Sequence, residues 1–97
     1  MAYPKFIITQ DGFLRLGMVT LHHHLLEAGD VCLGGGYWTI NHFSQEVELS
    51  GASSDYGPPQ WHRIAHLHLP EGYEGYTFVW KSGGQHIALS ELTKQKL

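Results

Sequence analysis

Residues 32–58 read CLGGGYWTINHFSQEVELSGASSDYGP, and this stretch decides how the chain builds its sheet. Val31 to Leu33 leads into three consecutive glycines, and the aromatic and β-branched run from Tyr37 to Ile40 is typical of a strand. A turn from Asn41 to Glu46 separates this run from the next strand, Val47 to Ser50. We expect these consecutive strands to pair antiparallel.

Two runs before the glycines also predict strands. Lys5 to Thr9 (KFIIT) is β-branched and aromatic, and it ends at the tight-turn signal Asp11-Gly12. Apolar and polar side chains alternate within Phe13 to Leu26, which includes three consecutive histidines. A period of two indicates a strand with two different faces, so this run is expected to form a longer strand.

After the glycines, Pro58 and Pro59 end any strand and are typical of a helix start. Apolar side chains then recur at near-helical spacing, which predicts one helix at about 59–68. The alternating, aromatic run from Tyr76 to Lys81 predicts a strand, and the tail from Ala88 to Leu97 is expected to form a short helix or to fray. The fold class that follows is α/β, a single-domain, β-rich sandwich over residues 1–97. We expect a mostly antiparallel or mixed sheet of about six strands with one or two helices.

Composition limits the function. The chain has 97 residues, 42% of them hydrophobic and 15% charged, as in an ordinary folded domain. Six basic and nine acidic residues give a net charge of −3, and no basic stripe follows a nucleic-acid backbone, so no nucleic acid is expected as a partner. One cysteine excludes an internal disulfide. No signal-like start and no apolar stretch of roughly 20 residues occur. We therefore expect a cytoplasmic protein that does not bind membranes.

The order of motifs resembles the Janus/Ocnus family of phosphohistidine phosphatases. The chain has, in the family's order, CLGGG, a strand-turn-strand segment, the loop G-x-S-x-x-Y-G-P at 51–58, a predicted helix and an aromatic strand that ends in Trp. Cys32 to Gln60 fits the family pattern without a gap. Lys5 to Ile8 (KFII) is similar to the family's first strand, which begins with a functional lysine.

The resemblance implies a catalytic histidine at the end of a strand. Val19 to His22 (VTLH) matches that strand end, which makes His22 the favoured catalytic residue. The alternative frame puts His23 there, because Arg15 then stands eight residues upstream, as a family arginine does. A slip of one residue turns every side chain of a strand to its other face, so both histidines cannot hold the role.

The resemblance also implies a cradle for the phosphoryl group, made of backbone N–H groups and a loop serine. Its members here are Lys5, Ser53 and the amides of His23 and Ser54, with Arg15 assisting. The chain departs from the family at Tyr37, where better-known animal members carry a basic residue.

Two functions are compatible with these residues. The first is metal-independent hydrolysis of phosphohistidine or phospholysine, without a cofactor, in a phosphorylated protein or a small phosphoramidate. An imidazole with a pKa near 6.5 serves there as general base or nucleophile. The alternative is a non-catalytic phosphate- or phosphoprotein-binding module of the same fold, which the change at Tyr37 motivates. The physiological substrate and the oligomeric state are not identified by the sequence.

Other chemistries are weaker. A cysteine phosphatase needs Arg six positions after its Cys, where this chain has Trp38, so Cys32 is expected to be a small buried core residue. Two histidine pairs suit a metal: one on the predicted strand and one with i,i+4 spacing on the predicted helix. The second pair, HRIAH at 62–66, lacks the Glu of H-E-x-x-H, and no metal site is expected. The remaining histidines are expected at the surface: His42, His68 and His86.

Overall fold

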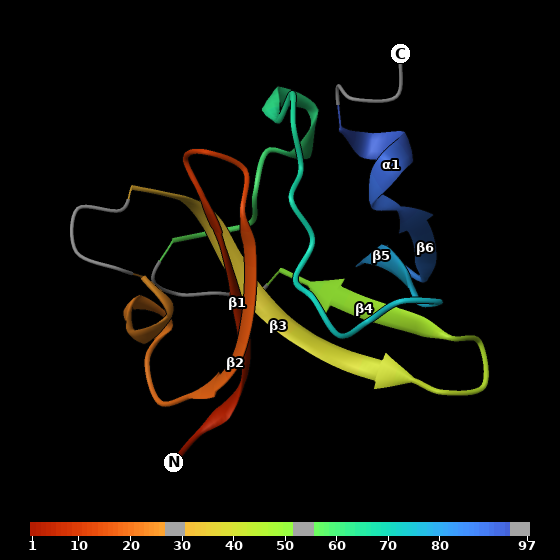
Figure 1. Cartoon of the computed structure of the whole chain (residues 1–97), viewed down its shortest axis with the longest axis horizontal. Helices are drawn as coiled ribbons and strands as arrows, with labels where there is room; N and C mark the ends of the chain where they lie inside the picture. Colours follow the sequence, from red (N-terminus) through yellow and green to blue (C-terminus); the bar gives the residue numbers. More distant parts are fainter. Residues whose placement is uncertain (27–30, 52–55, 94–97) are drawn as a thin grey trace.

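Six strands form one mixed sheet in the computed structural model, which describes residues 1–26, 31–51 and 56–93 (Figure 1). The strand order is β2-β1-β3-β4-β5-β6. The prediction of a β-rich α/β fold with about six strands and few helices is confirmed. The strands are β1 (Tyr3–Thr9), β2 (Leu14–Val19), β3 (Cys32–Asn41), β4 (Glu46–Ser50), β5 (Thr77–Ser82) and β6 (Gln85–Ala88). The helical pieces are the 3-10 turns η1 (His22–Leu25) and η2 (Trp61–Arg63) and the single turn α1 (Leu89–Leu92).

The long strand β3 joins the two halves of the sheet. It runs through all three glycines as one continuous element and pairs antiparallel with β1 on one side and β4 on the other. The expected antiparallel pairing of consecutive strands therefore holds for β3 and β4. By contrast, β4 and β5 are parallel, because the connection between them crosses from one end of the sheet to the other before β5 begins.

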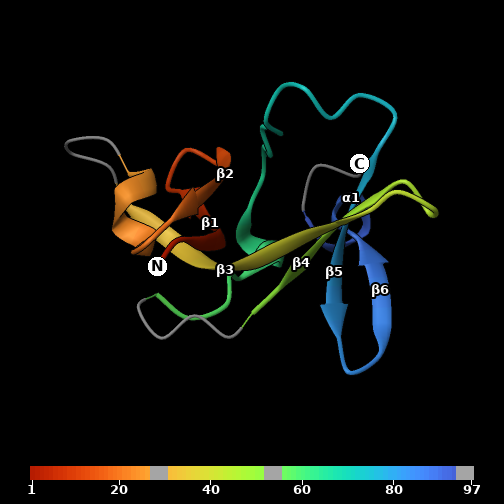
Figure 2. The ribbon, with the colours of Figure 1, turned by 90° about the horizontal axis from the view of Figure 1, so that it is seen from below.

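The core lies on one face of this sheet. Phe6 and Ile8 of β1 and Val47 and Leu49 of β4 are fully buried there, and Trp61 of η2 packs on them. Burying each of these side chains contributes about 1.5–3 kcal/mol. The turns η2 and α1 lie on this side of the sheet, whereas η1 lies on the other side of β1 (Figures 1 and 2). Strand β1 is thus covered on both faces, which explains its uninterrupted apolar run.

The predicted strand from Phe13 to Leu26 is wrong beyond Val19. The chain turns there into η1 and folds back over β2, so that Leu25 Cδ2 would lie 2.6 Å from a Cβ added at Gly17. Leu25 therefore packs on Gly17 across the face of β2, and the residues after Val19 do not continue the strand. As a result His22 and His24 do not share a strand face, and the first histidine pair considered for a metal does not form.

The predicted helix at 59–68 is also wrong. Only Trp61–Arg63 is helical, and Ile64 is already extended, with φ −88° and ψ 112°. Downstream, His68 exchanges backbone hydrogen bonds with the β1–β2 turn: its N–H donates to Gly12 O at 2.8 Å, and its carbonyl accepts from Leu14 N at 3.0 Å. These contacts hold the chain extended against its local helical pattern. The second histidine pair, at 62 and 66, consequently lacks a common helix face.

The C-terminal segment begins with a strand that the sequence pattern did not predict. Strand β6 pairs antiparallel with β5, and α1 follows it. The expected short helix in the tail is therefore present at Leu89–Leu92, while residues 94–97 lie outside the described residues. Among the described helices, none has the length and apolar character needed to cross a bilayer.

The glycines of β3 allow close approaches that a side chain would block. A Cβ added at Gly36 would overlap the carbonyl oxygen of Ser50 and lie 2.8 Å from Phe6 Cε1. The Ser50 oxygen belongs to the backbone of the adjacent strand β4, and the Phe6 ring is buried in the core. Neither group can move away without disturbing the sheet.

We predict that Gly36→Ala lowers the free energy of unfolding by about 1–3 kcal/mol, since a methyl group inserted there forces β3 and β4 apart. Urea denaturation followed by circular dichroism measures this. Met18→Ala, at an exposed position of the neighbouring strand β2, is the control and should cost less than about 0.5 kcal/mol. Equal midpoints for Gly36→Ala and the wild type would contradict the tight approach.

Candidate functional site

The turn η1 sets the positions of three consecutive histidines. The N–H of His24 donates to Leu21 O at 3.1 Å and that of Leu26 to His23 O at 3.0 Å, which closes the turn. His23 and His24 are exposed, and their rings lie 4.5 Å apart. His22 is only 2% exposed and faces the sheet. Thus the two histidines that compete for the catalytic role have opposite surroundings.

A hydrogen bond to β3 orients the His22 imidazole. Its Nε2 lies 2.8 Å from the carbonyl oxygen of Gly36. A carbonyl only accepts, so Nε2 must carry the proton and donate. In the neutral ring, Nδ1 is then the nitrogen with the basic lone pair. The ring reaches this position because Gly35 has no side chain: a Cβ there would lie 3.2 Å from His22 Cδ2.

Two tyrosines cover the imidazole. The ring centroids of His22 and Tyr37 are 5.5 Å apart with an interplanar angle of 75°, and those of His22 and Tyr56 are 6.4 Å apart at 82°. Both contacts are edge-on, a favourable geometry for aromatic rings. Tyr37, which departs from the family pattern, therefore contacts the candidate catalytic ring directly.

Two cations hold the ends of η1. The ammonium of Lys5 donates to Thr20 O at 2.8 Å and to Val19 O at 3.2 Å, immediately before the turn. Arg15 Nη1 donates to Leu25 O at 3.1 Å, at its end. Lys5 and Arg15 are the two cations among the predicted phosphate ligands. Both lie at η1, and they come from the adjacent strands β1 and β2.

The charge of Lys5 makes this region attractive to an anion. Lys5 is 7% exposed, and its partners among the described residues are neutral: two carbonyl oxygens and the ring of Tyr3, whose centroid lies 5.1 Å from Nζ. A buried charge is costly without a countercharge. An anion bound near η1 would supply one.

The remaining predicted phosphate ligands are the amide of His23 and the residues Ser53 and Ser54. The amide of His23 lies within η1, where the N–H groups of His24 and Leu26 donate to carbonyls of the turn. Ser53 and Ser54 lie outside the described residues, so their predicted contact with phosphate stays a prediction.

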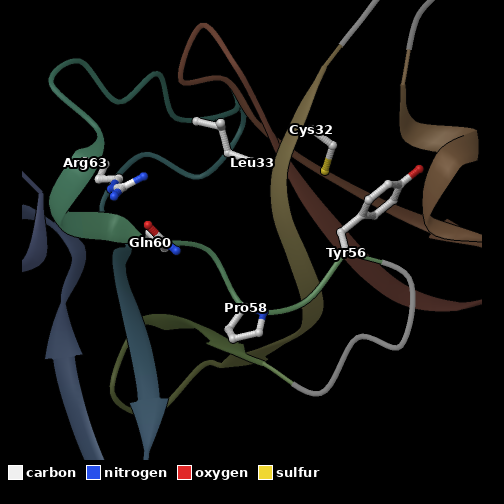
Figure 3. Close-up of a pocket in the computed structure, with 6 residues that line it drawn as sticks. All are labelled: Cys32, Leu33, Tyr56, Pro58, Gln60 and Arg63. Carbon is white, nitrogen blue, oxygen red and sulfur yellow. The ribbon is translucent and has the colours of Figure 1, made fainter.

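A cleft of about 300 Å³ opens beside the tyrosine that covers His22 (Figure 3). Tyr56 contributes to both the cleft and the cover of the imidazole. The sequence pattern did not predict this cleft, because its lining residues come together only where the 56–63 segment crosses the end of β3. The N–H of Gly35, for example, donates to Gly57 O at 2.9 Å. The cleft is lined by Cys32, Leu33, Tyr56, Pro58, Gln60 and Arg63.

Cys32 lies at this cleft, so the prediction that it is a buried core residue is wrong. It is half-buried, and its thiol donates to Gly34 O at 3.1 Å. Burial raises the pKa of the Cys32 thiol above its ordinary value, although hydrogen bonds with the backbone of Gly34 and Ile8 act in the opposite direction. The thiol is therefore protonated and weakly nucleophilic at neutral pH.

We predict that Cys32 reacts more slowly with a disulfide reagent at pH 8 in the native protein than in urea, because less thiolate is present. Absorbance of the released thiolate measures the rate. The unfolded thiol has the lower pKa and loses its proton first, so this group reduces folding stability as the pH rises through the ordinary pKa of a thiol. Cys32→Ser should lack that alkaline loss. A native thiol that reacts as fast as the unfolded one would contradict the effect of burial.

Comparisons of the chain with protein-family models, with curated proteins and with solved structures found no match.

Proposed function

We propose that this protein is a metal-independent phosphohistidine phosphatase in which His22 acts through Nδ1. The observation that carries the proposal is the 2.8 Å hydrogen bond from Nε2 to Gly36 O, because it leaves Nδ1 as the basic nitrogen. A histidine held in one tautomer by a backbone carbonyl is suited to general base or nucleophilic catalysis at neutral pH. The motif resemblance to the Janus/Ocnus family supports the same role.

In the proposed reaction, a phosphoramidate binds with its phosphoryl group at η1. Nδ1 of His22 either takes a proton from a water molecule that attacks phosphorus or attacks phosphorus itself. The P–N bond breaks as the leaving nitrogen of the substrate takes up a proton, which comes from Nδ1 when His22 is the base and from solvent when His22 is the nucleophile. If a phosphorylated His22 forms, water then cleaves its P–N bond and releases inorganic phosphate.

The cations at η1 would lower the cost of gathering negative charge on the phosphoryl oxygens. Lys5 and Arg15 both donate to carbonyls of the chain around η1, so they also hold the turn in place. The amides of His23 and Ser54 and the hydroxyl of Ser53 complete the proposed cradle. We propose a phosphorylated protein or a small phosphoramidate as substrate and the cytoplasm as the place of action.

A second candidate function follows from the burial of His22. The imidazole is 2% exposed beneath Tyr37 and Tyr56, so a phosphoryl group reaches Nδ1 only when a covering group moves. Without that movement the region would bind an anion at η1 but not hydrolyse it. This candidate is a non-catalytic phosphate- or phosphoprotein-binding module.

We predict that His22→Gln lowers kcat/KM for phosphohistidine or phospholysine hydrolysis by about 10²–10⁴-fold. Glutamine retains an N–H donor for Gly36 O but has no basic nitrogen, so the fold is kept while the base is lost. Release of inorganic phosphate in the presence of a chelator is the measurement. His23→Ala is the matched control at an exposed neighbour and should keep the wild-type rate.

The other outcomes separate the candidates. Loss of activity in His23→Ala with full activity in His22→Gln would mean that His23 is the catalytic residue. Full activity in both would refute a mechanism through either histidine. Wild-type protein that binds phosphate without turnover would favour the binding module, and activity abolished by the chelator would refute metal independence.

A further inference from the structure

A second polar cluster lies at the far end of the sheet from His22. Glu46 and Glu48 are two residues apart on β4 and so project from the same face, while Val47 and Leu49 project into the core. His86 of β6 reaches toward them across β5. The potential ligand atoms of Glu46, Glu48 and His86 all lie within 4.8 Å of one another.

The sheet register explains how His86 reaches across a strand. Glu48 pairs with Val79 of β5, which in turn pairs with Ala88 of β6, two residues from His86. Val79 and Ala88 have short side chains, so they leave space above β5 at this level. The cluster is therefore a product of strand order, since the carboxylates and the imidazole are about 40 residues apart in sequence.

His86 contacts both carboxylates, at distances close to those between two ligands of one ion. His86 Nδ1 lies 3.3 Å from Glu46 Oε1 and 3.9 Å from Glu48 Oε2. Hydrogen bonds of this kind are usually about 2.7–2.9 Å long. Ligands about 2.1 Å from a tetrahedral zinc ion are separated from one another by about 3.4 Å. Small side-chain adjustments would thus place all three atoms around one ion.

Neighbouring groups already orient the carboxylates. Glu48 is 8% exposed, and its Oε1 accepts from Thr39 Oγ1 at 3.4 Å and lies 3.5 Å from Lys81 Nζ. Its Oε2 accepts from Asn41 Nδ2 at 3.5 Å and lies 3.9 Å from His86 Nδ1. Glu46 Oε1 accepts from Ser44 Oγ at 3.1 Å. Outer hydrogen bonds of this type fix the ligands of metal sites in position.

The charges in the cluster also favour a cation. Two carboxylates, one of them nine-tenths buried, face one ammonium and one imidazole. The two carboxylates outnumber the one ammonium, so the acidic groups are in excess in the cluster. Lys81 is 45% exposed in its side chain, so it can swing away when a cation arrives.

We propose that Glu46, Glu48 and His86 form a binding site for one divalent transition-metal ion of the zinc type. The imidazole nitrogen selects such ions over Mg²⁺ and Ca²⁺, which prefer oxygen ligands alone. The His86 side chain is 38% exposed, so the ion enters from solvent and water completes its coordination. The site does not depend on the proposed phosphatase activity, because it shares no residue with η1.

The test is a Zn²⁺ titration of the full chain, with affinity measured by competition against a chromophoric chelator and location by amide chemical shifts. We expect wild-type protein to bind Zn²⁺ with shifts centred on Glu46, Glu48 and His86. His86→Gln and Glu48→Gln should each weaken this binding at least about tenfold. Lys81→Gln should strengthen it several-fold, because it removes a competing positive charge.

Two controls separate this site from other histidines. His42→Gln removes an exposed histidine whose Nδ1 lies 2.7 Å from the Tyr76 hydroxyl, and His24→Gln alters the histidine run in η1. Both should leave the Zn²⁺ affinity of the cluster unchanged. Shifts confined to residues 22–24, or equal affinity in His86→Gln and wild type, would overturn the proposal. If Glu48→Gln unfolds, the exposed positions His86 and Lys81 still decide the outcome.

Discussion

Three glycines in the central strand let four other parts of the chain approach β3 more closely than any side chain would allow. Pro59 lies over Gly34, the His22 ring lies over Gly35, and the Ser50 carbonyl and Phe6 ring crowd Gly36. Protein interiors are packed too densely to absorb an added methyl group at such points without movement. The glycine run therefore joins the core, the candidate site and the returning loop in one place.

The two faces of the sheet carry different kinds of side chain. One face carries the aromatic and aliphatic core under η2 and α1. The opposite face holds the imidazole of His22 near the start of β3 and the Glu46, Glu48 and His86 cluster near its end. In the first region, the positive charges of Lys5 and Arg15 favour an anion. In the second, excess carboxylate favours a cation, so one sheet face separates two opposite electrostatic preferences along its length.

The strands were largely predictable because their signals are local. The β-branched runs at Lys5 to Thr9 and Val47 to Ser50 and the aromatic run at Tyr76 to Lys81 need only a pleated, half-buried surface to be stable, and strands β1, β4 and β5 form there. The helix expected at 59–68 had an equally good local pattern. It failed because His68 gains two backbone hydrogen bonds from the β1–β2 turn, which an uninterrupted helix would not allow.

By itself the sequence determined the strand-forming runs. The resemblance to a known family implied that Lys5, Arg15 and His22 share one site, which stays a prediction. Tertiary structure decided what those residues contact. The turn of the chain at Val19 buried His22 against Gly35 and oriented its Nε2 toward Gly36, and strand order brought His86 to Glu46. Local patterns report backbone preference over a few residues. Contacts between residues far apart in sequence depend on strand order and on the space that each side chain leaves, which no single segment encodes.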